Sequence, residues 1–247
     1  MDNKEEQKTD CDFDQNLIKV QSVFKSFGKG EGEVKALKGV DLEVKKGELL
    51  VILGNSGSGK TTLLNMIGGI ERPTSGDILV KGHNICQYND KELTLYRRKE
   101  VGFVFQSFNL IPDLTARENV LLSASLSNNA SQVDEALEMV GLSAKKKKYP
   151  SQLSGGEQQR VSIARALVKK ADFFLCDEPT GSLDYQTGRQ IVTILEDLSK
   201  KQGKTVIFVT HTEALENIAN RVVRVKNGEI VDTKTNSVPL TVKDIQW

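Results

Sequence analysis

The chain has 247 residues, with 34 Lys and Arg against 33 Asp and Glu, so its net charge at pH 7 is +1. This length allows one large domain or a two-lobed domain with a sizeable core. A near-neutral charge gives no basic footprint of the kind that nucleic-acid binders show, so we expect no nucleic-acid partner.

Cysteine spacing and apolar run lengths exclude two further classes. Cys11, Cys86 and Cys176 lie far apart without Cys-x-x-Cys spacing, which argues against a disulfide framework and a zinc site and favours a reducing compartment. The longest apolar stretches are far shorter than the roughly 20 residues that a membrane span needs. Residues 1–15 are acidic and polar, unlike a signal peptide. We expect a soluble or peripheral protein.

The first third of the chain predicts a polar tail followed by strands. Residues 1–16 have little to bury, and we expect a disordered tail there. Residues 17–23 and 40–44 alternate apolar and polar side chains, as half-buried strands do, and a glycine-rich turn at 28–33 separates them. Residues 48–53 form a continuous apolar strand, which leads into a glycine loop and then a helix-forming stretch.

The glycine loop fits the Gly-x4-Gly-Lys-[Ser/Thr] phosphate-binding pattern between a strand and a helix. It comprises Gly54, Asn55, Ser56, Gly57, Ser58, Gly59, Lys60 and Thr61, with Thr62 following. Glycines let backbone N–H groups wrap a phosphate at the positive end of the helix. Lys60 is predicted to neutralise β- and γ-phosphate oxygens, and the Thr61 hydroxyl to ligate Mg²⁺. The pattern therefore predicts an ATP site with magnesium.

The middle of the chain, from about 89 to 169, is predicted to be helical. One stripe of apolar side chains at helical spacing ends at Gly141; it consists of Val133, Ala136, Leu137 and Val140. We interpret this stretch as an inserted helical lobe.

The last third predicts a strand, a helix and a strand in a parallel arrangement. Strands at 173–176 and 205–209 flank a helix with one apolar stripe, which predicts a βαβ unit; the stripe is Ile191, Ile194, Leu195 and Leu198. Residues 222–225 and 229–231 around the Asn227-Gly228 pair predict a hairpin.

Two carboxylates stand at the carboxyl end of the strand at 173–176, where parallel sheets bind their ligands. Asp177 and Glu178, taken alone, are more often a helix cap or a solvated turn. Together with the phosphate loop, they are predicted to work on the nucleotide. We expect Asp177 to hold the Mg²⁺ shell and Glu178 to polarise the attacking water.

Residues 153–160 carry the most specific motif, Leu-Ser-Gly-Gly-Glu-Gln-Gln-Arg. On physical grounds Ser154 caps a helix, and two glycines expose the first N–H groups of that helix as an anion site. The whole string resembles the signature sequence of ABC transporter ATPases. The resemblance runs from Leu17 to about Val231, with the motifs in family order.

The resemblance implies an α/β fold, with a P-loop ATPase core around a mixed sheet, an N-terminal antiparallel β subdomain and an inserted α-helical subdomain. Residues 17–247 would then be a single ABC ATPase domain. Within it, 17–88 and 170–247 would form the RecA-like core and the β subdomain, and about 89–169 the helical signature subdomain.

The resemblance also implies roles for single residues. Phe27 matches the aromatic that stacks on adenine, with Phe24 as the alternative ring. Gln106 matches the glutamine that touches Mg²⁺ and links the two lobes. Asp184 matches the loop that crosses a dimer interface, and His211 the switch histidine at the γ-phosphate. The signature residues would serve the ATP of a partner subunit; they are Ser154, Gly155, Gly156 and Glu157.

At the level of function, the resemblance implies an ATP-hydrolysing subunit that closes head to tail with a second copy of itself around two ATP molecules. It would power a separate membrane permease from the cytoplasmic face of the membrane. The permease would dock near Gln106 and the helical subdomain, where apolar residues between Phe103 and Leu114 form either a docking groove or ordinary core.

Segments such as 101–120 resemble the branch of macrolide exporters, lipoprotein-release systems, antimicrobial-peptide exporters and the cell-division ATPase. Export or extraction of a peptide, a lipoprotein or a drug-like compound would follow. The alternative is a non-transporting ABC ATPase that transmits force or regulation through a membrane partner. A soluble ABC factor acting on ribosomes or DNA would normally show two cassettes or a coiled-coil insertion, and the sequence has neither.

Overall fold

The computed structural model describes residues 16–127 and 129–246. The disordered tail expected for residues 1–16 lies outside the described residues, except for Asn16, which begins the first strand.

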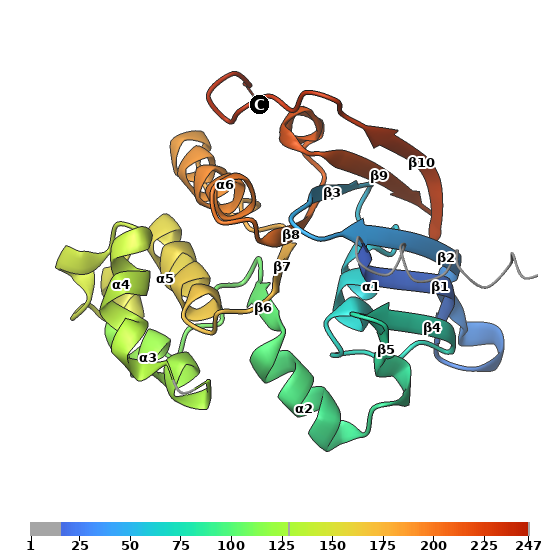
Figure 1. The fold of residues 1–247 in the computed structure, drawn as a ribbon, viewed down its shortest axis with the longest axis horizontal. Helices are drawn as coiled ribbons and strands as arrows, with labels where there is room; N and C mark the ends of the chain where they lie inside the picture. The colour runs from blue at the N-terminus through green and yellow to red at the C-terminus, as the bar shows by residue number, and fades with distance from the viewer. Residues whose placement is uncertain (1–15, 128, 247) are drawn as a thin grey trace, which may run out of the picture.

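A four-stranded antiparallel sheet forms one side of the molecule, at the right of Figure 1. Its order is β2 (Val34–Lys45), β1 (Asn16–Phe27), β4 (Ser75–Val80) and β5 (His83–Asn84). Alternating residues of β1 and β2 are buried, as their sequence pattern predicts, and they line one hydrophobic core.

A six-stranded mixed sheet lies in the middle of the molecule (Figure 1). Only β9 and β10 pair antiparallel; the other neighbours are parallel. The order is β10 (Glu229–Thr235), β9 (Arg221–Lys226), β3 (Leu49–Leu53), β8 (Thr205–Thr210), β7 (Phe173–Asp177) and β6 (Val101–Val104). All five residues of β3 are buried, because both faces of this strand are covered.

Helices cover both faces of the six-stranded sheet, so the core has two parts. Leu50 and Ile52 of β3 face the part that includes α1 and the four-stranded sheet, whereas Leu49, Val51 and Leu53 face the part that includes α3 to α6. The helices are α1 (Lys60–Ile67), α2 (Asp90–Lys99), α3 (Ala116–Leu126), α4 (Val133–Met139), α5 (Gly155–Leu167) and α6 (Tyr185–Lys200). Short 3₁₀ helices cover Gly30–Gly32, Ile85–Gln87, Ala130–Gln132, Ser143–Lys145, Pro150–Gln152 and Glu213–Ile218.

The predicted α/β class is confirmed, and so are the βαβ unit of β7, α6 and β8 and the C-terminal hairpin of β9 and β10. The uniformly helical reading of 89–169 is wrong at one place, because β6 pairs with β7 at the edge of the central sheet. The run Val-Gly-Phe-Val is short and apolar throughout, and periodicity cannot separate such a strand from a buried turn of helix. β4 and β5 were not predicted from the sequence.

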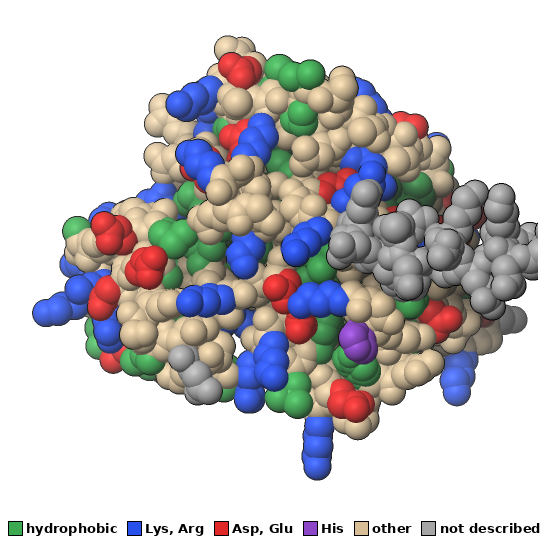
Figure 2. Space-filling view, viewed as in Figure 1, with side chains coloured by type: hydrophobic (Ala, Val, Ile, Leu, Met, Phe, Trp, Pro, Cys, Tyr) green, Lys and Arg blue, Asp and Glu red, His purple; other side chains and the backbone are tan. Residues whose placement is uncertain are grey.

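Among the helices that the structure describes, none is long and apolar enough to cross a membrane. On the face shown in Figure 2, basic and acidic side chains are interspersed over most of the surface.

Candidate functional site

The glycine loop joins β3 to α1, as the motif requires. It spans residues 54–59, and α1 begins at Lys60. Gly59 caps the helix in a left-handed conformation, φ 105°, and a Cβ there would lie 2.6 Å from the carbonyl oxygen of Ala36. Only glycine meets both demands. Four buried residues of α1 pack into the hydrophobic core and hold the helix in place; they are Leu63, Leu64, Met66 and Ile67.

Lys60 is buried inside the loop that it follows. Its Nζ donates to the carbonyl oxygens of Gly54 at 2.7 Å and Asn55 at 2.8 Å. Burial lowers the pKa of this ammonium group, against the opposing pull of the Glu178 and Asp177 carboxylates. The direct hydrogen-bond partners of Nζ are neutral carbonyl oxygens, and a bound anion in the loop would replace them with charged oxygens.

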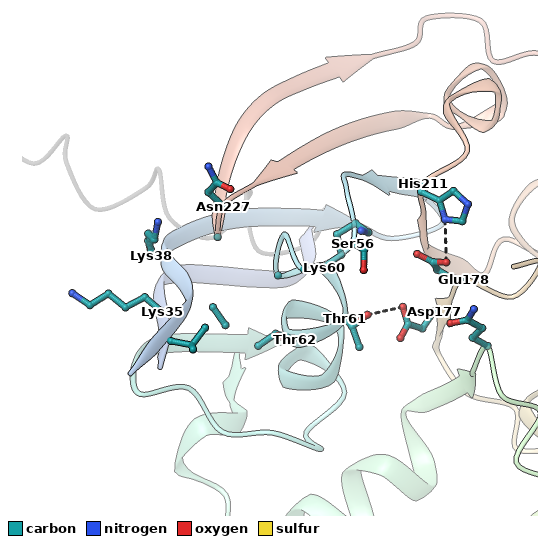
Figure 3. Close-up of a pocket in the computed structure, with 16 residues that line it drawn as sticks. Lys35, Lys38, Ser56, Lys60, Thr61, Thr62, Asp177, Glu178, His211 and Asn227 are labelled. Atoms are coloured by element: carbon teal, nitrogen blue, oxygen red, sulfur yellow. Dashed lines mark hydrogen bonds and ion pairs between the residues drawn. The ribbon is translucent and has the colours of Figure 1, made fainter. Parts of the chain in front are cut away.

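The carboxyl end of β7 places two carboxylates next to this loop. Asp177 Oδ1 accepts a hydrogen bond from Thr61 Oγ1 at 3.0 Å, and His211 Nδ1 lies 3.1 Å from Glu178 Oε2. Figure 3 shows both pairs on the same side of the pocket. Glu178 has a positive φ of 42°, which is unusual for a non-glycine residue and typical of functional sites.

These groups share one cavity of about 730 Å³. Its wall includes residues of the phosphate loop, the two carboxylates at the end of β7, Gln106 and His211. The lining residues are Val34, Lys35, Ala36, Lys38, Ser56, Gly57, Gly59, Lys60, Thr61, Thr62, Gln106, Asp177, Glu178, His211, Asn227 and Gly228. In Figure 3, Lys35, Lys38 and Asn227 lie on the opposite side from Asp177, Glu178 and His211. The cavity is therefore long enough to separate a carboxylate end from a basic end.

Three predicted loop residues face a neighbouring cavity of about 280 Å³ between the loop and β9; they are Gly54, Asn55 and Ser58. Phe27 is not among the residues that line either cavity. Its ring is 42% exposed, with Lys25 Nζ 4.8 Å from the ring centroid. The alternative, Phe24, packs against Gly39.

The signature residues begin α5, away from the large cavity. Ser154 Oγ accepts from the backbone N–H of Glu157 at 3.3 Å, and Glu157 Oε2 accepts from the backbone N–H of Ser154 at 3.0 Å. In this capping box Ser154 is exposed, Gly155 and Glu157 are half-buried, and Gly156 is buried. Neither these two residues nor Gly155 or Gly156 lines the cavity of their own chain.

Asp184 caps the next helix, α6, with its carboxylate accepting from the backbone N–H of Thr187 at 3.1 Å. It lines a separate cavity of about 290 Å³, and Glu178 and His211 line that cavity too. The segment between Glu178 and Asp184 therefore runs along a second cavity, which shares Glu178 and His211 with the large one.

Sequence reasoning missed one wall of the site, formed by Val34, Lys35, Ala36 and Lys38 of β2 and by the turn residues Asn227 and Gly228. No motif marks the β2 residues. The strand was predicted only at 40–44, whereas β2 begins at Val34. The position of its first residues over the phosphate loop depends on the packing of two sheets. The Asn-Gly pair predicts a turn, but its contact with the loop is tertiary.

The oxygen donors at the Thr61 and Asp177 end suit a hard cation. Burial raises the pKa of the Asp177 carboxyl, and the neighbouring Glu178 raises it further. No group of three or more His, Cys, Asp and Glu able to hold a metal occurs within residues 16–127 and 129–246. A hydroxyl and one carboxylate instead fit Mg²⁺, which keeps several waters and takes other ligands from substrate phosphates.

We expect Asp177→Asn to raise the melting temperature of the protein in EDTA without nucleotide. The folded pKa of Asp177 lies above its ordinary value of 3.8, so its ionised form is disfavoured by folding. This penalty is fully present at neutral pH and disappears as the pH falls through the folded pKa towards the unfolded value. Calorimetry from pH 8 down to pH 4 should show the advantage of the variant narrowing as the pH approaches the unfolded pKa of 3.8.

The matched control is Asp184→Asn. A hydrogen bond from Thr187 lowers the pKa of Asp184, so this change should not raise the melting temperature at neutral pH. Equal stabilisation by both variants would contradict the assigned cause.

Comparisons with known proteins point to one family. The family model for ABC transporter matches residues 37–181. An ABC transporter ATP-binding protein of Mycoplasma genitalium is 43% identical over 95% of this chain and 51% of its own length. One from Methanocaldococcus jannaschii is 42% identical over 87% of this chain and 98% of its own length. The macrolide export ATP-binding/permease protein MacB of Mannheimia succiniciproducens is 41% identical over 93% of this chain and 36% of its own length. The chain thus spans about half of the Mycoplasma relative.

Solved structures agree. The dimeric ATP-binding cassette MJ0796 in a post-hydrolysis state, bound to ADP and Pi, has a TM-score of 0.83 and 40% identity, covering 89% of this chain and 98% of its own. The cbiO1 chain of Clostridium perfringens, part of the ABC transporter complex cbiONQ, has a TM-score of 0.80 and 30% identity, covering 90% of this chain and 89% of its own.

Proposed function

Since this chain belongs to the ABC transporter family of ATP-binding proteins, we propose that it hydrolyses ATP and thereby powers a separate membrane permease. One observation carries the proposal. The phosphate loop, the Thr61–Asp177 pair and the Glu178–His211 pair line one cavity of about 730 Å³. Binding of ATP and its hydrolysis are the activities that this set of groups supports.

The triphosphate is proposed to lie in the loop, with backbone N–H groups of the loop and the Lys60 ammonium facing its oxygens. Lys60 would then exchange the carbonyl oxygens of Gly54 and Asn55 for phosphate oxygens. The basic end of the cavity, at Lys35 and Lys38, remains for the rest of the nucleotide. We retain Phe27 as a proposed contact to adenine, which would need its exposed ring to turn towards the cavity.

Thr61, Asp177 and Gln106 are the proposed magnesium ligands, and a bound Mg²⁺ would neutralise charge on the phosphate oxygens. Glu178 accepts the proton of the attacking water in this proposal, and His211 holds the Glu178 carboxylate from the solvent side at 3.1 Å. Glu178 has a positive φ of 42°, directly after β7, and its side chain lines the cavity.

The signature helix supports a proposed head-to-tail dimer. Ser154, Gly155, Gly156 and Glu157 form an intact helix start that does not line the cavity of its own chain. A second copy would bring this positive helix end to the γ-phosphate. The loop at Asp184, which lies between Glu178 and α6, would then cross the interface. The dimeric cassette MJ0796 is similar to this chain, and the similarity covers 89% of this chain.

We place the permease contact beside Gln106. Phe103 and Phe105 stack there with ring centroids 5.1 Å apart, over a cavity of about 120 Å³. Arg165 and Lys169 also line this cavity, so it combines apolar and cationic groups. About 89–169 is the proposed signature lobe, with β6 attaching it to the core made by 17–88 and 170–247. This arrangement would let a membrane partner at the cytoplasmic face sense the ATP site.

Export of a peptide, a lipoprotein or a drug-like compound is the substrate class that we propose. MacB of Mannheimia succiniciproducens, named a macrolide export protein, is 41% identical to this chain. The name of this MacB protein joins an ATP-binding part and a permease part, and this chain covers 36% of its length. A separate or adjoining permease is therefore part of the proposal.

We expect Ile111→Glu to abolish co-purification with the membrane subunit while leaving the ATPase activity of the isolated chain intact. Ile111 lies in the loop after Gln106 and is 38% exposed, so the chain should still fold when its side chain is changed. Leu110, which the sequence pattern also marks, packs against the main core and is a poorer probe. The control is Val238→Glu, at a side chain that is 82% exposed elsewhere. Normal assembly of the Ile111 variant would place the contact on another surface.

The proposed activity is tested with the purified chain, Mg²⁺ and ATP. We expect hydrolysis by the wild type, and background hydrolysis with ATP affinity lowered about tenfold or more in Lys60→Ala, because a charge facing the phosphates is lost. Lys46→Ala removes an exposed lysine outside the cavity and should match the wild type. Absence of ATP binding by the folded wild type would overturn the proposal.

A further inference from the structure

The turn of the C-terminal hairpin lies against the phosphate loop. Asn227 and Gly228 connect β9 to β10, and their φ values of 51° and 84° are those that a two-residue type I′ turn requires. An Asn-Gly pair suits any such turn, and most of these turns face solvent. Here, however, Gly228 is buried and both residues line the large cavity. The turn therefore makes contacts that hairpin formation alone does not need.

Backbone hydrogen bonds tie this turn to two other segments. The Gly228 N–H donates to the carbonyl oxygen of Ser58 in the phosphate loop at 2.9 Å. The Gly228 carbonyl oxygen accepts from the Lys38 N–H of β2, also at 2.9 Å. One residue thus links the phosphate end of the cavity to its basic end.

The three backbones meet with no room for a methyl group. A Cβ on Gly228 would lie 2.7 Å from the carbonyl oxygen of Ala36 and 3.2 Å from Leu37 Cα. A Cβ on Gly59 would lie 2.6 Å from the same oxygen. These obstacles are backbone atoms, which cannot move aside as the end of a side chain can. The contact therefore needs glycine on both the loop and the turn.

The same hairpin also contacts the other end of the loop. β9 pairs with β3 as far as Leu53 and Arg224, where the loop begins. A Cβ on Gly54 would lie 2.2 Å from the carbonyl oxygen of Val225. The loop is thus held by the hairpin where it leaves β3 and again at Ser58, just before α1. Between these two points, Ser56 and Gly57 of the loop line the large cavity.

We propose that the β9–β10 hairpin is a template that holds the phosphate loop in its binding conformation, with Gly228 as the positioning residue. The inference rests on the proposed function, because the loop is the phosphate site of that proposal. A loop already held in place loses less conformational freedom when phosphate binds, so the template raises affinity without touching the nucleotide through a side chain. Displacing the turn should therefore weaken binding of the triphosphate.

The test compares Gly228→Ala with Gly203→Ala. Both positions have left-handed backbone, φ 84° and 63°, so alanine is strained at each, but an added Cβ at Gly203 meets no atom within 4 Å. By fluorescence titration, Gly228→Ala should raise the Kd for Mg-ATP about tenfold or more, and Gly203→Ala should leave it unchanged. Thermal unfolding of both variants without nucleotide reports the strain that they share.

Glu229→Ala changes the residue that follows the turn, whose side chain is exposed and lines neither the large cavity nor the one beside it. The backbone contacts of the turn remain in this variant, so the Kd should stay at the wild-type value. A rise in Kd as large as that of Gly228→Ala would overturn the template, as would a folded Gly228→Ala protein that binds Mg-ATP normally.

Hydrogen exchange in the wild-type protein decides the matter if Gly228→Ala does not fold. Exchange at the Gly228 and Lys38 amides should slow when Mg-ATP binds, because both amides belong to the linked backbones. The Lys81 amide donates to the Leu17 carbonyl in another turn and should not change. Unchanged exchange at Gly228 and Lys38 in a protein that binds Mg-ATP would overturn the inference. A wild-type protein that does not bind Mg-ATP would instead overturn the proposed function.

Discussion

Glu178→Gln is expected to bind ATP with wild-type affinity and to hydrolyse it about 10²- to 10⁴-fold more slowly, the range associated with loss of a general base. The amide keeps the shape of the side chain and can still accept a hydrogen bond from His211, which lies 3.1 Å away in the wild type. It cannot take a proton from water. Single-turnover hydrolysis separates this defect from a defect in binding.

The same variant should accumulate as an ATP-bound dimer. If two chains close around two nucleotides and hydrolysis reopens them, a chain that cannot hydrolyse stays closed. Size-exclusion chromatography with Mg-ATP should show the dimer for Glu178→Gln, and a monomer when ATP is omitted. The control, Glu213→Gln, changes an exposed carboxylate beside Arg224 and should hydrolyse ATP normally. Wild-type turnover in Glu178→Gln would show that another group activates the water.

Mixing two inactive variants should restore activity. Lys60→Ala disables the phosphate loop, and Ser154→Arg obstructs the signature helix start, which lies outside the cavity of its own chain. If each ATP lies between the loop of one chain and the signature of the other, each homodimer has two defective sites. A mixed dimer has one intact site and one site with both defects. Random pairing of equal amounts should then give about one quarter of the wild-type rate.

A coupled phosphate-release assay over a range of mixing ratios measures this recovery. Activity should peak at equal amounts and fall towards zero at either extreme. Lys147→Ala in place of Ser154→Arg serves as a control for the helical lobe, since the Lys147 side chain is exposed on that lobe. If the mixture stays inactive while Glu178→Gln still forms its dimer, the signature helix does not complete the partner's site.

The local sequence was enough to predict most elements near the site. The order of strand, glycine loop and helix at residues 48–60, the acidic end of β7 and the Asn-Gly hairpin all follow from short-range rules, and the structure has each of them. These rules work because phosphate loops and type I′ turns require particular backbone angles, and few residues adopt those angles. The roles of the individual residues in catalysis stay predictions.

Other features depended on contacts between distant segments. β6 is too short for periodicity to identify, and it is a strand because β7 offers it a parallel edge. Phe27 carries an aromatic ring at the predicted position, yet that ring is exposed outside the cavity, since packing of β2 over the loop decides which side chains line it. Such positions are set by the geometry of two packed sheets.

By itself, then, the sequence determined the fold class and the residue types of the predicted site, because its motifs encode local backbone shape and charge. Only the tertiary structure decided how that site is held. The buried glycine of an ordinary-looking turn, Gly228, contacts both β2 and the phosphate loop through backbone atoms. Backbone contacts leave almost no trace in the sequence beyond the absence of a side chain, and a glycine in a turn already has a local explanation.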